Sequence, residues 1–363
     1  MTAAGTSLTV MLFLISVFRT VTSQASFLEV FIPQYRFLTD SAYKGLIPLT
    51  ESENNFQKAR KMGKLQPTLN ESVPFPCDVT IGRSKIRPTT VHALRPGDID
   101  VIGAIGDSLT AGNGLIATDI IQTTLQNRGL SFSGGGQSNW RTFTTLPNIL
   151  KEFNPKLKGY ALRDSFVNQN YSQLNVAEAG AMSIDMYFMS KEIISRIKNN
   201  PEINFNEDWK VIVKDLSIIR DVSLENRPPP CYFTHNFVCP CLFGLQFRNQ
   251  QNRLDQIMTD WKNIEKEVAA LDEFDRDEFT VVLQPFAENY DIKRDKSGLV
   301  DYSVFSYDCF HLSQKEHGRA ATSLWNNLLE PVGLKSTYPS EVFNFLCPTS
   351  NRPFIYTRRN SAN

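Results

Sequence analysis

The chain alternates short apolar runs with longer segments in which apolar residues recur every three or four positions. The apolar runs predict strands at residues 99–105, 174–177, 209–213 and 279–284. The longer segments predict helices at 51–62, from 147 onward, and at 183–198, 250–271 and 314–329. Strands that alternate with helices favour an α/β fold with a parallel sheet covered on both faces.

The two ends of the chain differ in composition from its centre. Residues 1–23 contain an apolar stretch, Leu8 to Phe18, followed by small residues, which predicts a secretory signal peptide. Residues 24–97, rich in Pro and polar residues, predict an N-terminal extension packed on a main domain at 98–335, and 336–363 form a C-terminal extension. No later run of eighteen apolar residues occurs, so we expect a secreted mature chain without a C-terminal membrane anchor. A retained N-terminal anchor is the alternative.

The overall composition is that of a globular protein. Of 363 residues, 41% are hydrophobic and 21% are charged, which allows one large domain with extensions. Lys and Arg number 38, as do Asp and Glu, so the net charge gives no indication of a nucleic-acid partner. Sequons at Asn70 and Asn170 lie in polar surroundings and predict N-glycosylation in an exported chain.

The six cysteines form an even set that an oxidising compartment would pair, with fifteen connectivities open. Residues 221–244 carry three consecutive prolines and three of these cysteines, which predicts a stapled loop. A structural zinc site is the alternative there, because four zinc-capable residues lie within eleven positions. Their spacing fits no common zinc module, and export favours disulfides. These residues are Cys231, His235, Cys239 and Cys241.

The first predicted strand leads directly into Gly106-Asp107-Ser108-Leu109. Open α/β sheets carry their chemistry at the C-terminal ends of strands. A serine at the start of the following helix lies beside free backbone N–H groups, which can hold the negative charge formed when an ester carbonyl is attacked. Ser108 is therefore a candidate nucleophile, and an ordinary strand-to-helix turn is the alternative.

A second motif near the C-terminus supplies the partners that a nucleophilic serine needs. Asp308 precedes His311 by three residues, close enough for the carboxylate to fix the imidazole tautomer and stabilise the imidazolium. Ser313 and Glu316 predict a capping box, which places the pair in the loop before the helix at 314–329.

A serine hydrolase needs a base among the four histidines of the chain. His311 is the best placed of them. His317 borders the buried stripe of its predicted helix, and His92 lies in the approach to the first strand, so we expect both to have packing roles.

Three blocks of the chain resemble signature blocks of the GDSL (SGNH) hydrolases: Gly106-Asp107-Ser108-Leu109, Asn175-Val176-Ala177-Glu178-Ala179-Gly180 and Asp308-x-x-His311. Longer stretches resemble the membrane-associated phospholipase B type of that family, and the resemblance runs from about residue 70 to the C-terminus. These stretches are 145–150, 208–210, 283–286 and 308–333.

The resemblance implies a flavodoxin-like three-layer α/β/α sandwich and a serine hydrolase that uses no metal or other cofactor. Ser108 would be the nucleophile, His311 the general base and then acid, and Asp308 the residue that orients His311. The backbone N–H groups of Ser108 and Gly180 would donate to the oxyanion. The implied substrates are acyl esters of phospholipids or lysophospholipids, met transiently at a membrane or micelle surface, with a carbohydrate-linked acetyl ester as runner-up.

The fourth signature block of the family is missing from the sequence. This block is an apolar strand that ends in Gly-x-Asn-Asp and whose Asn is the third oxyanion donor. The chain reads as if a segment had been excised between Trp209 and Leu216, so we expect the sheet to lack one central strand-and-helix unit. None of the nearby asparagines follows an apolar strand with a glycine two residues before it; these are Asn204, Asn206 and Asn226.

Two functions remain open from the sequence. The first is a secreted serine esterase that forms an acyl-enzyme at Ser108. The second is a weakened or inactive pseudo-enzyme that keeps the fold and binds lipid, because loss of one oxyanion donor costs about 10²- to 10³-fold in turnover.

Overall fold

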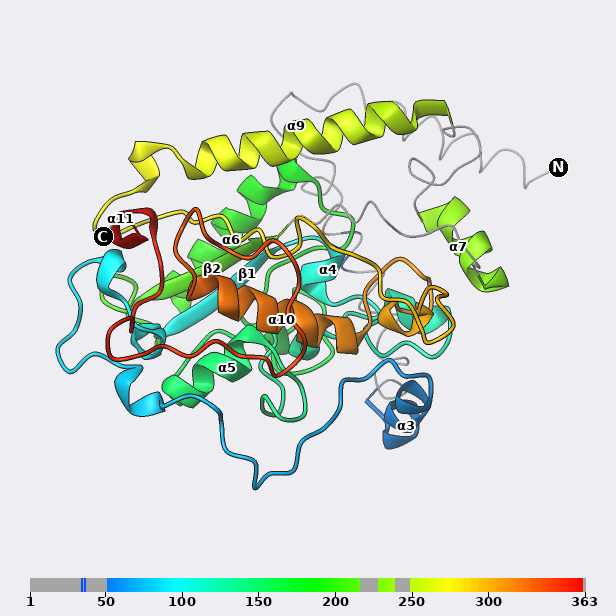
Figure 1. The fold of residues 1–363 in the computed structure, drawn as a ribbon, viewed down its shortest axis with the longest axis horizontal. Helices are drawn as coiled ribbons and strands as arrows, with labels where there is room; N and C mark the ends of the chain where they lie inside the picture. The colour runs from blue at the N-terminus through cyan, green and yellow to red at the C-terminus, as the bar shows by residue number, and fades with distance from the viewer. Residues whose placement is uncertain (1–33, 35, 37–50, 216–227, 239–248, 362–363) are drawn as a thin grey trace.

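The first predicted strand lies at the centre of the structure, which is a computed structural model that describes residues 34, 36, 51–215, 228–238 and 249–361 (Figure 1). Strand β1 (Val101–Gly106) is buried along its whole length. It pairs in parallel with β2 (Lys210–Asp215), in a register that sets Val101 opposite Lys210 and Gly106 opposite Asp215. Both strands were predicted from their apolar runs, and both are confirmed.

Helices cover both faces of this small parallel sheet, as the alternation of strand side chains requires. On one face Ile102 packs with α5 (Leu146–Phe153) and α10 (Gln314–Leu328) in a cluster that includes Trp325. On the other face Val101 and Ile105 pack against Met189, Ile193 and Ile197 of α6 (Met186–Asn199). The described chain therefore has a mixed α/β architecture built on a parallel strand pair.

The predicted helices are all confirmed, with small shifts at their ends. Besides α5, α6 and α10, the predicted set includes α3 (Glu53–Lys61) and α9 (Gln251–Ala269), which lies along the top of the molecule in Figure 1. The described ranges also contain three helices that the periodicity did not predict, α4 (Ser108–Ala111), α7 (Pro229–Val238) and α11 (Arg358–Ser361). Single 3-10 turns lie at Val79–Ile81, Val91–Ala93, Pro96–Asp98, Ile121–Thr124, Arg128–Leu130, Asn170–Ser172, Ser183–Asp185, Asp272–Phe274 and Tyr302–Val304.

The strand predicted at 174–177 is wrong as a strand, although the segment does lie beside β1. Its pairing is a single parallel bridge between Ala104 and Asn175. The N–H of Val176 donates to the Ala104 carbonyl at 2.9 Å, but the N–H of Asn175 donates locally to Ser172. The Glu178 N–H also donates to the Gly106 carbonyl at 3.1 Å, so the segment follows β1 with intermittent hydrogen bonds and not with the regular pairing of a strand.

The strand predicted at 279–284 is also wrong. Its pairing in the described chain is one antiparallel bridge between Asp275 and Thr280. An apolar run becomes a strand only where a neighbouring strand accepts its hydrogen bonds. Within the described ranges the sheet stops at β2, so this segment has no strand beside it.

The stapled loop predicted at 221–244 contains helix α7, so the prediction of a loop is wrong for 229–238. The helix begins at Pro229, and proline in the first helical turn loses no hydrogen bond because the N–H groups there have no partner within the helix. Residues 216–227 and 239–248, with Cys239, Cys241 and Asn226, lie outside the described residues.

The predicted capping box at the start of α10 is wrong as well. Ser313 is the N-cap, but its side chain makes no capping hydrogen bond. Glu316 turns instead to Arg319, at 2.5 Å in a buried ion pair. The helix still begins at the predicted residue, because the N–H groups of Glu316 and His317 donate to the Ser313 carbonyl.

A disulfide joins the two predicted extensions. Cys77 and Cys347 are bonded, with their Cα atoms 5.2 Å apart, and Cys77 packs in the same cluster as Trp325. The indole N–H of Trp325 donates to the carbonyl of Leu346 at 2.8 Å. Both extensions thus contact the α10 face of the sheet.

A helix with the length and apolar character to cross a bilayer is absent from the described ranges, and the predicted signal peptide lies outside them.

Candidate active site

Ser108 lies at the C-terminal end of β1, as its sequence position predicts. Asp107 caps the short helix α4, with its carboxylate accepting from the Leu109 N–H at 2.8 Å, and Ser108 is the first residue of the helix. The strand must approach β2 closely here. A Cβ at Gly106 would lie 2.3 Å from the Asp215 carbonyl oxygen, so the position requires glycine.

Ser108, His311 and Asp308 form a continuous hydrogen-bonded series. The Nε2 atom of His311 lies 2.8 Å from the Ser108 Oγ, and its Nδ1 lies 2.5 Å from the Asp308 Oδ2. With Nδ1 donating to the carboxylate, Nε2 is left to accept the serine proton. Asp308 and His311 are buried. The structure therefore brings together the three residues that the sequence selects.

The loop that carries Asp308 and His311 is held by its own backbone. The Asp308 Oδ1 accepts from the N–H groups of Phe310 and His311, both at 3.0 Å. The Ser306 N–H donates to the His311 carbonyl at 2.7 Å. Cys309, between the pair, has φ +59°, a left-handed conformation that is unfavourable for a residue with a Cβ.

The electrostatics of the pair favour an ionised Asp308 and a basic His311. Burial alone would lower the pKa of His311, but the adjacent Asp308 carboxylate outweighs it and raises that pKa above its ordinary value. Burial would likewise raise the pKa of Asp308, but the His311 charge and the hydrogen bonds from His311 and Phe310 lower it. General-base catalysis by His311 requires this combination of an ionised carboxylate and an imidazole that readily accepts a proton.

A second buried carboxyl lies beside the nucleophile. Burial, together with the charge of Asp215 across the strand pair, raises the pKa of Asp107 from 3.8 to about 7. The sequence reasoning did not select Asp215. The position of Asp215 near Asp107 could not be predicted, because the register between β1 and β2 is set only when the two strands pair in the folded sheet.

The remaining histidines do not contact Ser108. His317 is fully buried and its Nδ1 accepts from the Phe132 N–H at 3.1 Å. Burial and the nearby His311 lower its pKa to about 3, so it remains neutral. His92 bridges Thr357 and the Arg276 carbonyl, at 2.8 and 3.1 Å. Both have the packing roles that we expected.

Gly180, the second expected oxyanion donor, lies on a loop tied to the end of β1. The Glu178 N–H donates to the Gly106 carbonyl at 3.1 Å, which anchors the loop two residues before Ser108. Gly180 has φ +79°, and no atom lies within 4 Å of a Cβ built there. Arg36 pairs with Glu178 at 2.9 Å, so the N-terminal extension also contacts this loop.

Arg128, which the sequence reasoning missed, fixes the position of that loop. Its guanidinium is fully buried and donates to the carbonyl oxygens of Ser165, Asn175 and Ala177 at 2.9, 2.9 and 2.6 Å. These bonds fix the segment that leads to Gly180. No pattern in the sequence singled out Arg128, because an isolated arginine in a loop normally lies at the surface.

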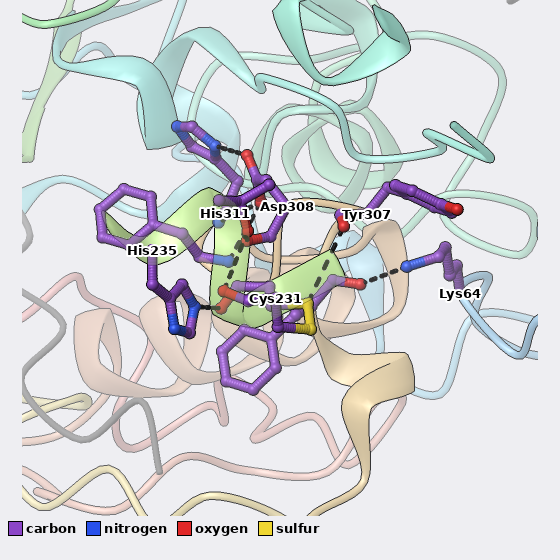
Figure 2. Close-up of a disulfide and its surroundings, with 10 residues drawn as sticks. Lys64, Cys231, His235, Tyr307, Asp308 and His311 are labelled. Carbon is purple, nitrogen blue, oxygen red and sulfur yellow. Dashed lines mark hydrogen bonds and ion pairs between the residues drawn. A yellow bond between two sulfur atoms is a disulfide. The ribbon is translucent and has the colours of Figure 1, made fainter. Parts of the chain in front are cut away.

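Lys64 is a third residue that the sequence reasoning missed. Its buried ammonium donates to the Phe305 carbonyl at 2.7 Å, close to the loop that carries Asp308 (Figure 2). Burial lowers the pKa of Lys64 to about 8. The N-terminal extension thus supports the candidate site, although the sequence predicted only that it packs on the main domain.

Two of the four residues of the alternative zinc site, Cys231 and His235, have other partners. Cys231 forms a disulfide with Cys309, and the Nε2 atom of His235 lies 2.8 Å from the Cys309 carbonyl. Figure 2 shows this contact between α7 and the loop of Asp308 and His311. Among the described residues, no group of three or more His, Cys, Asp or Glu side chains could hold a metal ion.

The chain was compared with known proteins. No protein-family model and no solved structure matches it. Human membrane-associated phospholipase B1 is 36% identical over an alignment of 331 positions, which covers 76% of this chain and 22% of the relative. The chain resembles phospholipase B1. The mouse protein of that name is 34% identical over an alignment of 366 positions, which covers 86% of this chain and 25% of the relative, and the rat protein is 35% identical over 329 aligned positions.

This chain spans about a quarter of the length of the curated phospholipase B1 relatives that it matches. The alignments cover most of the chain at a third or more of identical residues. They support a phospholipase B-like family for it.

The asparagine that would be the third oxyanion donor of such a hydrolase is not supplied by the asparagines before β2. The Asn204 Oδ1 accepts from the N–H groups of Asn206 and Glu207 in an exposed turn. That turn precedes Lys210, which pairs with Val101 at the far end of β1 from Ser108. A strand rises about 3.3 Å per residue, so its six residues separate the turn from the nucleophile.

A cavity of about 670 Å³ lies beside the candidate site, between the end of β2, helix α9 and residues 283–290. Its volume lies within the range of small-molecule pockets, roughly 300 to 1,000 Å³. Leu109 and Leu312, the neighbours of Ser108 and His311 in sequence, form part of its wall. Asp215 and Phe286 lie on the wall as well.

Proposed function

We propose that the protein is a GDSL-type serine hydrolase that cleaves acyl esters of phospholipids or lysophospholipids. The observation that carries the proposal is the series Ser108–His311–Asp308, with distances of 2.8 and 2.5 Å. The similarity to phospholipase B1 supports the substrate class. The α/β architecture is compatible with the three-layer sandwich of that family, with the hydrolase domain at 98–335.

In the proposed first half-reaction, the Ser108 Oγ attacks the ester carbonyl and the His311 Nε2 takes its proton. Asp308 holds the resulting imidazolium by its bond to Nδ1. The N–H groups of Ser108 and Gly180 would donate to the oxyanion of the tetrahedral intermediate. His311 then protonates the leaving alcohol as the carbon–oxygen bond breaks, which leaves an acyl-enzyme at Ser108.

In the second half-reaction, His311 takes a proton from water as the water oxygen attacks the acyl-enzyme carbonyl. The intermediate collapses, Ser108 regains its proton from His311, and a fatty acid is released. No step requires a metal ion or an organic cofactor.

We propose that the protein meets its acyl ester substrate at a membrane or micelle surface. We also propose that it is secreted and carries N-glycans on the exposed Asn70 and Asn170.

We further propose that a strand-and-helix unit with the third oxyanion donor is missing after Trp209. Three observations support this hypothesis. Ile212 of β2 is 39% exposed, whereas Ile102 of β1 is 0% exposed. Within the described ranges β2 has no strand on its outer side. The cavity lies between the end of β2 and residues 283–290, which overlap the end of the strand predicted at 279–284. A parallel strand is normally buried on both faces.

Sequencing of independent full-length transcripts tests the missing unit. Coding sequence for Gly-x-Asn-Asp between Trp209 and Asp215 is the expected result. Uninterrupted short transcripts in every clone would contradict it.

A weakened hydrolase or lipid-binding pseudo-enzyme is the second candidate function. The absent asparagine favours it, and so does the charge of Asp215 near Asp107, the residue before Ser108, because a negative charge disfavours an oxyanion nearby. An ester assay on the purified chain separates the two functions. The hydrolase predicts turnover of a short-chain ester and of lysophosphatidylcholine that Ser108→Ala abolishes. Equal background from both proteins would reject it.

A further inference from the structure

We propose that helix α7 positions the candidate catalytic loop, and that Thr234 and His235 are positioning residues for the Asp308–His311 pair. The inference rests on the proposed hydrolase function. It assigns a role to residues 229–238 that neither their sequence pattern nor the mechanism above accounts for.

Three side chains from one face of α7 reach the loop. The Thr234 hydroxyl donates to the Asp308 carbonyl at 2.8 Å, and the His235 Nε2–H donates to the Cys309 carbonyl at 2.8 Å. Cys231, one turn earlier, is bonded to Cys309. Residues at spacings of three and four lie on the same face of a helix, so a single surface of α7 makes all three contacts. Figure 2 labels Cys231 and His235 on this surface.

These contacts act on the part of the loop that most needs support. Thr234 and His235 are 5% and 0% exposed, so the two carbonyl groups they bind are shielded from water on that side. Cys309 has φ +59°, and such a conformation persists only where the surroundings hold it. A buried carbonyl without a donor would turn toward another partner.

The displaced backbone would carry the catalytic carboxylate with it. The Asp308 Oδ1 is bonded to N–H groups within the same loop, and Oδ2 lies 2.5 Å from the His311 Nδ1. Rotation of the Asp308 peptide therefore changes the direction in which the carboxylate faces the imidazole. Thr234 touches neither substrate nor the reacting atoms, and it acts through Asp308.

The test compares Thr234→Val, which removes the hydroxyl at nearly constant volume, with Thr234→Ser, which keeps it. Thr322→Val is the matched control, because the Thr322 hydroxyl is also buried and also donates to a backbone carbonyl, that of Gly318 at 3.0 Å in α10. Each full-length variant is assayed with lysophosphatidylcholine, and its folding is checked by circular dichroism.

We expect Thr234→Val to lower kcat about 10- to 100-fold, the cost of small misplacements in an active site. KM should stay unchanged, and Thr234→Ser should restore kcat. Equal effects of Thr234→Val and Thr322→Val, or a change confined to KM, would overturn the positioning role.

A readout that needs no turnover separates this proposal from the hydrolase function. The proton shared by the His311 Nδ1 and Asp308 gives a downfield resonance in the ¹H NMR spectrum, which His311→Gln identifies by removing it. Thr234→Val should shift or broaden that resonance, while Thr234→Ser and Thr322→Val leave it in place. An unchanged resonance in Thr234→Val would overturn the positioning role, whether or not the wild-type protein hydrolyses esters.

Discussion

Gly106 at the end of β1 lies opposite Asp215 at the end of β2, close enough that a Cβ on Gly106 would meet the Asp215 carbonyl oxygen at 2.3 Å. This register brings the Asp215 charge beside Asp107, the residue before the candidate nucleophile. Burial and the charge of Asp215 together raise the pKa of Asp107 from 3.8 to about 7.

That shift predicts a stability that depends on pH. Between pH 4 and pH 7 the unfolded chain has lost the Asp107 proton while the folded protein keeps it, so the folded state loses stability as pH rises. Asp107→Asn keeps a cap for α4 and removes this loss. The free energy of unfolding of the variant, relative to wild type, should rise by roughly 2 to 4 kcal/mol across the window, as measured by urea unfolding.

Asp78→Asn is the control for that measurement. Asp78 also caps a short helix, but its hydrogen bonds with Thr80 lower its pKa, so any slope should have the opposite sign. A flat difference between Asp107→Asn and wild type would contradict the raised pKa of Asp107.

The pH dependence of turnover should follow His311. Its pKa is raised above 6.5, because the Asp308 carboxylate outweighs the effect of burial, and only neutral His311 can accept the Ser108 proton. Turnover should therefore fall as pH drops through this raised pKa. Asp308→Asn should move the acidic limb to lower pH and reduce kcat by about 10⁴-fold, as the equivalent change does in other triads. An acidic limb at the same pH in both proteins would exclude His311 as the group that sets it.

Arg128 should matter for both stability and activity. Arg128→Met leaves the carbonyl groups of Ser165, Asn175 and Ala177 without their donor, at about 1 to 3 kcal/mol for each buried group. We expect a loss of at least about 3 kcal/mol in urea unfolding, and lower turnover, because the loop to Gly180 loosens. Arg163→Met, at an exposed arginine over the Tyr171 ring, is the matched control. Equal losses in the two variants would contradict the role of Arg128.

The disulfide between the extensions should stabilise the whole domain. Cys77 and Cys347 are 270 residues apart, so the bond constrains a long loop in the unfolded chain. The double variant Cys77→Ala and Cys347→Ala should lose about 2 to 5 kcal/mol of unfolding free energy. Turnover of the folded variant should stay at the wild-type level, because neither cysteine contacts Ser108, His311 or Asp308. A stability loss below about 1 kcal/mol would show that the extensions are held by packing alone.

Local patterns were sufficient to predict the central elements and the grouping of the site residues. The apolar run before Ser108 and the periodicity of α6 and α10 are encoded within single segments, and the spacing of Asp308 and His311 is fixed by one loop. Pairing between segments is a different property. The run at 279–284 has the composition of a strand, but the neighbour that would make it one is not in the described sheet.

The supporting residues around the site could not be predicted for the same reason. Arg128, Lys64 and Thr234 each bind backbone carbonyls of residues remote in sequence, and no periodicity marks such contacts. The three prolines at 228–230 favoured a loop, yet proline is also compatible with the first turn of a helix.

The central claim is that Ser108 becomes acylated during ester hydrolysis. The most direct measurement is to quench the purified protein with acid during turnover of a p-nitrophenyl ester and to map the acyl group by peptide mass spectrometry. An acyl group on Ser108 that accumulates during turnover, and that Ser108→Ala lacks, is the predicted result. Turnover in Ser108→Ala at the wild-type rate, or an acyl group found only on another residue, would contradict the claim.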